Sequence, residues 1–270
     1  MICATKCWRA MRERTRPVDR RAVAAIQVTL IAFALVAWEL SVRVHLVDPF
    51  FFSAPSQIGA TIGNWWQHGY VLRDVAITMQ ETLFGLLVGG ALGIVLAVLL
   101  ASSRWLSSIF TPFLVLLNSV PRVTLVPLFI LWFGFTLWSK VVSAVALVLF
   151  VVFFATYDGI KDVDPTLVAN VRVMGASRVA VMRHVLIPSA LTWIFSSLRS
   201  AVGFALIGAV VAEYFGAQAG VGYRIQWSES QLNTSGVFGG LFILMVLVFL
   251  INLFFQWLQR RLLVWKPADP

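Results

Sequence analysis

Residues 162–188, DVDPTLVANVRVMGASRVAVMRHVLIP, form the one sizeable water-soluble interruption in a chain otherwise made of apolar segments. The pattern predicts two short helices joined at Gly175. Asp164 is suited to cap the first helix, and Pro165 to occupy its first turn. Gly175 is suited to the left-handed turn that ends this helix. The segment therefore predicts a compact helical loop outside the membrane.

The first of these helices carries an apolar stripe. Leu167, Val171 and Met174 recur at i, i+4 and i+7, so they fall on one helix face. Three basic residues flank the stripe: Arg172, Arg178 and Arg183. An apolar face on a water-exposed segment favours docking of a partner protein. A helix lying on the membrane surface is the alternative interpretation.

The rest of the chain has the composition of an all-α integral membrane protein. Hydrophobic residues make up 60% of the sequence and charged residues 12%, whereas soluble domains average about 45–50% and 25%. We expect about six transmembrane helices, since six apolar runs are long enough to cross about 30 Å of hydrocarbon. These runs are 22–42, 76–101, 110–133, 139–157, 188–212 and 237–258. They predict one membrane domain, residues 22–260, between tails 1–21 and 261–270.

The net charge of +9 is distributed as in a membrane protein and gives no sign of a nucleic-acid-binding face. Basic residues concentrate in the N-terminal tail, in the loop 159–187 and near the C-terminus. By the positive-inside rule, these segments and both termini are cytoplasmic. Cys3 and Cys7 are the only cysteines and cannot complete a tetrahedral metal site by themselves.

Polar residues inside the predicted spans are candidates for a translocation pathway. The third span contains Asn118, Pro121 and Arg122, and the fifth contains Arg199 and Glu213. Charged groups within a span face the bundle interior or a wet cavity, because lipid does not solvate them. Two interpretations stay open for Arg122: lining the pathway, or forming a structural ion pair with an acidic residue such as Glu81 or Glu213. Both arginines are compatible with an anionic substrate.

Glycine-rich stretches predict close packing and turns. Gly85, Gly89 and Gly93 form small-xxx-small pairs in the second span, which let another helix approach closely. The connection 216–236 begins GAQAGVGY. We interpret it as a flexible gate or docking rim, with a solvated loop as the alternative.

No sequence motif for catalysis accompanies these features. His45, His68 and His184 lie near or outside the span ends, and the sequence lacks a His-x-x-x-His pair and a Walker-type glycine loop. We therefore expect a chain that is not an enzyme and binds neither a metal nor a cofactor. If ATP and Mg drive the system, they bind to another subunit.

The spacing of the 162–188 segment is similar to the EAA loop of bacterial ABC importer permeases, in which Glu-Ala-Ala is followed by three residues, Gly, nine residues and Ile-x-Leu-Pro. Gly175 holds the glycine position, and Val185, Ile187 and Pro188 hold the last ones. The Glu-Ala-Ala positions read Ala169, Asn170 and Val171. The usual carboxylate is absent, so its contact with the ATPase is expected to be weaker, replaced or made by another residue.

Four further runs resemble the nitrate/sulfonate/taurine/bicarbonate branch of these permeases. They are PSQIGATI (55–62), LGIVLAVLLASSRWL (92–106), VPLFILWFG (126–134) and AEYFGAQAGVGYRI (212–225). The resemblance implies the type I ABC importer permease fold and a place in the bacterial inner membrane. It also implies two ATPase subunits, a second permease copy as a homodimer, and a periplasmic or lipid-anchored solute-binding protein.

The resemblance further implies roles for individual residues and a class of substrate. The residues expected to couple to the ATPase are Leu167, Ala169, Asn170, Val171, Arg172, Met174, Gly175, Arg178, Ile187 and Pro188. The expected substrate is a small anion such as a sulfonate, taurine, nitrate or bicarbonate. Two alternatives are a channel or ion-coupled carrier without an ATPase, and a membrane scaffold that docks a soluble partner.

Overall fold

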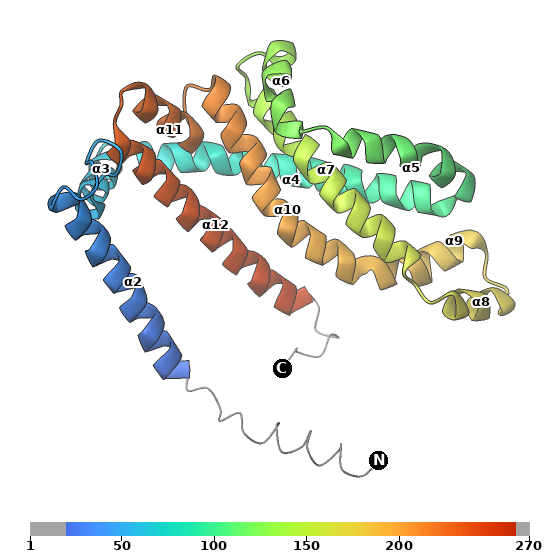
Figure 1. The fold of residues 1–270 in the computed structure, drawn as a ribbon. Helices are drawn as coiled ribbons and strands as arrows, with labels where there is room; N and C mark the ends of the chain where they lie inside the picture. The colour runs from blue at the N-terminus through green and yellow to red at the C-terminus, as the bar shows by residue number, and fades with distance from the viewer. Residues whose placement is uncertain (1–19, 263–270) are drawn as a thin grey trace, which may run out of the picture. The chain divides into compact units, whose positions relative to one another are not determined.

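The computed structural model describes residues 20–262, which form helices joined by short connections and contain no strand (Figure 1). The chain divides into two compact units, Met1–Ala60 and Thr61–Pro270. Residues 1–19 and 263–270 lie outside the described range. The two cysteines and most of both expected tails fall there.

The first unit contains α2 (Arg20–Arg43) and the beginning of α3 (Pro55–Gln67). The carboxylate of Glu39 ties them together. It accepts hydrogen bonds from Arg43 Nε at 2.7 Å, from Ser56 N at 3.0 Å and from Ser56 Oγ at 2.8 Å. One acidic side chain therefore fixes how the chain returns after the first span.

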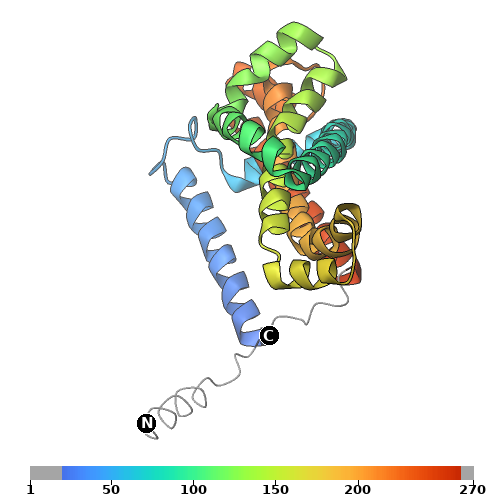
Figure 2. The ribbon, with the colours of Figure 1, turned by 90° about the vertical axis from the view of Figure 1, so that its right-hand side faces the viewer.

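The core of the second unit consists of three long helices, α4 (Tyr70–Ser102), α7 (Leu137–Lys161) and α10 (Ile187–Gly216), which lie side by side in Figures 1 and 2. Glycines let α4 and α7 approach closely, as the small-xxx-small pattern predicted. A Cβ atom added to Gly93 would lie 2.7 Å from the Leu149 carbonyl oxygen, and one added to Gly89 would lie 2.9 Å from Val148 Cβ. Neither position has room for a side chain without a shift of α7.

The third span was predicted over 110–133 as a helix bent by its prolines; it begins earlier, at Arg104, and is broken into separate elements. It consists of α5 (Arg104–Ser119), the 3-10 turn η1 (Arg122–Leu125) and α6 (Val126–Phe133), bent by 81° at the break. Pro121 stands at the break, where it has no N–H to continue the hydrogen bonds of α5. The hydropathy of the run is continuous, and hydropathy does not report a change of direction.

Five described helices are long and apolar enough to cross a membrane, and the number is six if the bent pair counts as one span. The remaining elements of the second unit are α8 (Pro165–Val173), α9 (Arg178–Val181), the π turn η2 (Met182–Leu186), α11 (Val221–Ser230) and α12 (Thr234–Leu262). In Figures 1 and 2, α8 and α9 lie at one end of this unit and α6 at the other.

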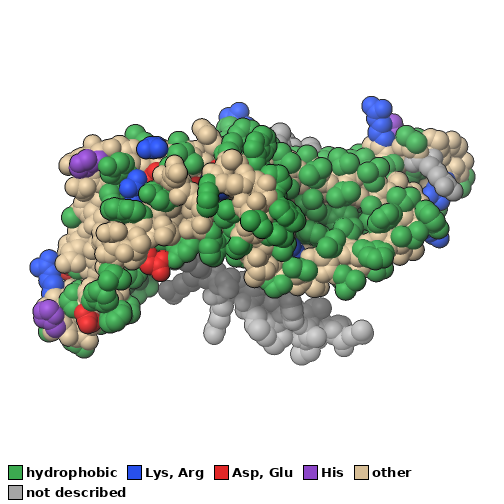
Figure 3. Space-filling view, turned by 90° about the horizontal axis from the view of Figure 1, so that it is seen from above, with side chains coloured by type: hydrophobic (Ala, Val, Ile, Leu, Met, Phe, Trp, Pro, Cys, Tyr) green, Lys and Arg blue, Asp and Glu red, His purple; other side chains and the backbone are tan. Residues whose placement is uncertain are grey.

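Large apolar side chains cover much of the outer surface (Figure 3). Leu87 on α4 and Leu116 on α5 are each 66% exposed, and Phe249 on α12 is 61% exposed. Such a surface would be unstable in water but is the ordinary outer face of a membrane protein. Apolar side chains on the outside agree with the integral membrane fold class expected from composition.

Candidate functional site

Helix α8 begins with the predicted cap. Asp164 Oδ1 accepts a hydrogen bond from Thr166 N at 2.8 Å, and Pro165 occupies the first turn. The hydrogen bonds that Thr166 donates hold the pKa of the Asp164 carboxyl below its usual value. The cap is therefore charged at neutral pH, and its contribution to helix stability is lost only as the pH falls through that lowered pKa.

Helix α8 ends at Gly175, which has φ +88°. Two backbone bonds close the end: Gly175 N to Arg172 O at 2.9 Å and Ala176 N to Val171 O at 3.3 Å. This is the Schellman pattern, in which a left-handed residue satisfies the last carbonyls of a helix. The predicted turn at Gly175 is confirmed, and the segment before it is a fixed helix.

The apolar residues exposed on α8 differ in part from the predicted stripe. Leu167 is 46% exposed and Met174 is 85% exposed, but Val171 is half-buried. Val173, which lies outside the predicted stripe, is 89% exposed. The exposed apolar group is therefore Leu167, Val173 and Met174, because the face that carries Val168 and Val171 turns inward.

The segment after Gly175 is not a separate short helix as expected. α9, η2 and α10 run on as one membrane-length helix, Val179–Gly216, of 38 residues. The π turn at Met182–Leu186 comes directly before Pro188, whose ring would clash with a carbonyl in a regular α-helix. The spacing of the last motif residues therefore marks a π turn inside a continuous helix.

The other predicted coupling residues lie along the same segment. Ala169, Asn170 and Arg172 are exposed on α8. Ile187 is half-buried and Pro188 is exposed at the start of α10. The side chain of Arg178 lies outside the described part of the chain.

Arg122 is the first residue of η1, and its side chain reaches back across the break to α5. Its guanidinium donates to Asn118 O at 3.1 Å and to Asn118 Oδ1, and its Cζ lies 4.7 Å from the centre of the Phe150 ring. Among the side chains that the structure describes, the ion pairs are Glu39–Arg43 and Asp74–Arg224. The ion pair of Arg122 with Glu81 or Glu213 is therefore not formed, because the bend at Pro121 turns the guanidinium back onto α5.

Arg199 lies on a face of α10 that points away from the helices of its own unit. Its neighbours on that face are Ser196 and Ser200, which are exposed, and Gly203, where an added Cβ would meet nothing within 4 Å. Arg199 itself is half-buried and forms no ion pair within the described range. The same side of the helix also exposes Trp193, Phe204 and Ile207, so the small residues form a short polar patch around Arg199 within an otherwise apolar face.

Glu213 lies near the C-terminal end of α10 and is completely buried. Its carboxylate faces the first residues of α11. Its Oε2 accepts from Gly222 N at 2.7 Å, and its Oε1 accepts from Thr78 Oγ1 at 2.6 Å. Thr78 Oγ1 accepts in turn from Val221 N at 3.0 Å, and Asp74 Oδ1 accepts from Gly220 N at 3.2 Å. Three successive N–H groups at the start of α11 are thus bound by side chains of α4 and α10.

We call Asp74, Thr78 and Glu213 the α11 latch. Carboxylates at a helix N-terminus are favourable because its free N–H groups carry partial positive charge. Gly220 has φ +113°, so the residue that enters the latch needs the conformational freedom of glycine. The segment 220–222 is therefore held on two helices, which agrees with the predicted close packing of this segment and contradicts the alternative of a solvated loop.

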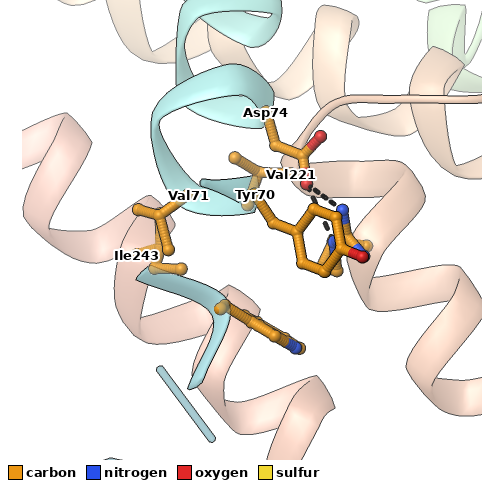
Figure 4. A pocket seen from close by; sticks show the side chains of 7 residues that line it. Tyr70, Val71, Asp74, Val221 and Ile243 are labelled. Atoms are coloured by element: carbon orange, nitrogen blue, oxygen red, sulfur yellow. Dashed lines mark hydrogen bonds and ion pairs between the residues drawn. The ribbon is translucent and has the colours of Figure 1, made fainter. Parts of the chain in front are cut away.

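Arg224 extends the latch outward. Its Nε donates to Asp74 Oδ2 at 2.8 Å, and its Cζ lies 4.3 Å from the centre of the Tyr70 ring. In Figure 4, Tyr70 and Asp74 of α4 and Val221 of α11 border one cavity. That cavity measures about 10 Å³, which is about the limit for one water molecule. The region is close-packed and is a structural joint instead of a substrate site.

Two further charged groups are buried beside the latch. Glu81 is 2% exposed and Lys140 is 6% exposed, and both interact electrostatically with Glu213. Sequence reasoning named Glu213 but did not identify Asp74, Thr78, Lys140 and Arg224. Asp74, Thr78 and Glu81 recur at helical spacing in the start of an apolar span, and that pattern was the available signal.

The comparison with family models settles which family has this arrangement. Residues 89–264 match the model described as "Binding-protein-dependent transport system inner membrane component". The chain belongs to this family. It is an ABC importer permease with the type I permease fold. The channel, carrier and scaffold alternatives are set aside.

Individual relatives agree with this result. The permease is 32% identical to the formylaminopyrimidine transport permease protein ThiX of Halalkalibacterium halodurans, over 93% of this chain and 100% of that protein. It is 31% identical to the putative aliphatic sulfonates transport permease protein SsuC of Bacillus subtilis, over 88% and 87%. It is 29% identical to the taurine transport system permease protein TauC of Escherichia coli, over 88% and 90%.

These relatives confirm the resemblance to the nitrate/sulfonate/taurine branch. The family consists of transport subunits, and membership implies an ATPase and a solute-binding protein as partners. The permease is a multi-pass membrane protein.

Proposed function

We propose that this permease forms the pore of a bacterial inner-membrane importer for a small oxyanion-bearing solute, such as a sulfonate. Two copies form the pore, two ATPase subunits that bind ATP and Mg dock on the cytoplasmic face, and a solute-binding protein delivers the solute from outside. Both termini are then cytoplasmic. The names of the relatives and the free face of Arg199 support the choice of substrate.

The observation that carries the proposal is the exposed apolar group of α8. Leu167, Val173 and Met174 project from a helix whose two ends are fixed by Asp164 and Gly175. Apolar side chains that are rigidly held outside the membrane spans favour burial against a protein partner. We infer that they fill a groove of the ATPase, with Arg172 beside its rim.

The continuous helix after Gly175 supplies the mechanical link. A helix of 38 residues is roughly 55 Å long, longer than the hydrocarbon layer. Its first turns therefore lie beside α8, and its later turns carry Arg199 and Glu213. Movement of α8 by the ATPase is passed through Gly175 into this helix, which rocks the pore face.

Co-purification tests the docking of the ATPase. We expect a tagged permease, extracted from its native membrane in mild detergent, to retain a Walker-motif ATPase. The variant Leu167→Asp/Met174→Asp should retain at least about ten times less, because two charges would be buried in an apolar groove.

Leu232→Asp is the matched control. Leu232 is 71% exposed, in the turn between α11 and α12, and its φ of +54° is one that Asp tolerates. This turn is at the end of the unit opposite α8 (Figure 1), so ATPase recovery should stay normal. Equal recovery with the α8 double variant, or no ATPase with the unchanged permease, would contradict the proposal.

The face of α10 around Arg199 is the proposed lining of the pathway. Ser196, Ser200 and Gly203 leave space beside the guanidinium. An arginine within a span that forms no ion pair with its own chain is suited to bind an anion passing through the pore.

Replacing Arg199 with glutamine is expected to raise the KM for uptake of a sulfonate about ten-fold or more, since a hydrogen bond to a charged group contributes about 1.5–3 kcal/mol. Uptake of radiolabelled substrate over a concentration series measures this. Arg199→Lys keeps the charge and should recover part of the loss. An unchanged KM in Arg199→Gln would place the pathway elsewhere.

Helix α5 supports pairing of two copies. None of its residues is buried, and Phe110, Phe113 and Leu117 are 48%, 61% and 56% exposed. We infer that a second copy covers this face in the assembled pore.

A further inference from the structure

A groove lies between α5 and the end of α7 and has no place in the transport scheme. Its volume is about 620 Å³. Its surface is mostly apolar, but the polar side chains gather at one end, here called the polar half: Ser107, Ser108 and Thr111 of α5 and Tyr157 of α7. The Tyr157 hydroxyl contacts Ser107 Oγ and lies 3.5 Å from Thr111 Oγ1. Tyr157 is 4% exposed, so its hydroxyl is fixed at the floor of the groove.

Lys161 stands at the mouth of this polar half. Its Nζ lies 4.3 Å from the centre of the Tyr157 ring, which orients the ammonium group over the groove. Lys161 is exposed and forms no ion pair with any described side chain, although Asp158 and Asp162 are near it in sequence. Its charge is therefore available to an anion held in the groove.

The other half of the groove is apolar. It is lined by Pro112, Val115 and Leu116, of which Leu116 is 66% exposed. These residues are about one to two turns further along α5 than Ser108. A ligand that fills the whole groove thus has a charged head bearing acceptor oxygens and an apolar tail that follows α5.

The polar half of the groove also lies at the ends of two apolar helices, where the chain passes from the hydrocarbon core of the membrane to its headgroup region. Lys161 is the last residue of α7 and Arg104 is the first residue of α5. Basic residues at this level attract anionic lipid headgroups. A membrane phospholipid reaches this level from the side, whereas its acyl chains remain in the hydrocarbon beside Leu116.

We propose that the groove is a binding site for an anionic phospholipid. The phosphate lies against the Lys161 ammonium and the hydroxyls of Ser107 and Thr111, and one acyl chain lies along Val115 and Leu116. Lys161 is three residues before the cap of α8, so the bound lipid is a neighbour of the segment that docks the ATPase. The inference requires only the membrane position of α5 and α7 and is independent of the transported solute.

Native mass spectrometry of the purified permease with its co-purified partners tests this site. The complex is titrated with dioleoyl phosphatidylglycerol or dioleoyl phosphatidylcholine. We expect tighter retention of phosphatidylglycerol, and a loss of about five-fold in its affinity in Lys161→Gln, since one lysine near a lipid surface has an effect of that size. Lys161→Arg should keep the affinity.

Arg73→Gln is the matched control. Arg73 is an exposed basic residue near the N-terminal end of α4, whereas the C-terminal end of α4 is the one that connects to α5. This variant removes the same charge and should leave phosphatidylglycerol binding unchanged. Equal retention of the two lipids, or an equal loss in both charge variants, would overturn the proposal. Saturable binding of hexanesulfonate in phosphatidylcholine nanodiscs, lost in Lys161→Gln, would overturn the lipid assignment in favour of the transported solute.

Discussion

Replacing Glu213 with alanine is expected to abolish uptake and to lower the stability of the permease by about 1–3 kcal/mol. The substitution leaves the Gly222 N–H without its acceptor in a fully buried place, whereas the Thr78 hydroxyl can still donate to the Asp74 carbonyl oxygen at 3.0 Å. Each unsatisfied buried group costs about 1–3 kcal/mol. The start of α11 would then separate from α4 and α10. Thermal unfolding in detergent, followed by tryptophan fluorescence, and solute uptake in cells measure the two effects.

Two variants make this result specific to the latch. Glu213→Gln keeps one acceptor oxygen and should be milder than alanine. Glu229→Gln removes an exposed carboxylate of α11 that binds the Tyr214 hydroxyl, and it should leave uptake near normal. If Glu213→Ala and Glu229→Gln unfold at the same temperature, the α11 latch has no structural role.

Replacing Gly175 with valine is expected to lower solute uptake at least about ten-fold while the chain still inserts into the membrane. Gly175 has φ +88°, and an added Cβ would meet nothing within 4 Å. The penalty therefore comes from the backbone conformation alone, which costs a β-branched residue about 1–3 kcal/mol. The Schellman turn would open, and α8 would no longer be held at a fixed angle to the following helix. Uptake at equal membrane levels of protein measures the effect.

Gly175→Asn and Gly63→Val are the controls. Asparagine adopts the left-handed conformation more readily than valine, so Gly175→Asn should retain much of the activity. Gly63 lies in α3 in an ordinary helical conformation and also has open space around its Cβ position. Normal uptake in Gly175→Val, or equal losses in Gly175→Val and Gly63→Val, would contradict the role of the turn.

The local features of the coupling segment could be predicted from the sequence because they depend on neighbouring residues. The cap of Asp164 and the turn at Gly175 each involve atoms within a few residues along the chain. The choice of which apolar residues of α8 face outward could not be predicted. Val171 and Val173 have the same side chain, and only packing makes the first half-buried and the second exposed.

The polar residues of the spans show the same limit. Arg122 was expected either in the pathway or in an ion pair, and the bend at Pro121 instead turns it onto Asn118 and Phe150. The hydropathy of a run gives the length of a span but not its direction. The bend of 81° could therefore not be predicted from hydropathy. Of the residues expected in the pathway, Arg199 keeps that proposed role, whereas Glu213 belongs to the α11 latch.

The sequence by itself determined the class of this protein, the number of apolar segments and the motif that identifies the family, since composition, hydropathy and residue spacing are properties of the chain alone. Only the tertiary structure decided that a glycine-rich connection is latched and not flexible. Two hydrogen bonds of the latch join residues 135 and 146 positions apart, Thr78 to Glu213 and Asp74 to Gly220. A hydrogen bond between distant residues exists only after α4, α10 and α11 have packed, because its strength depends on a separation that the linear order does not specify.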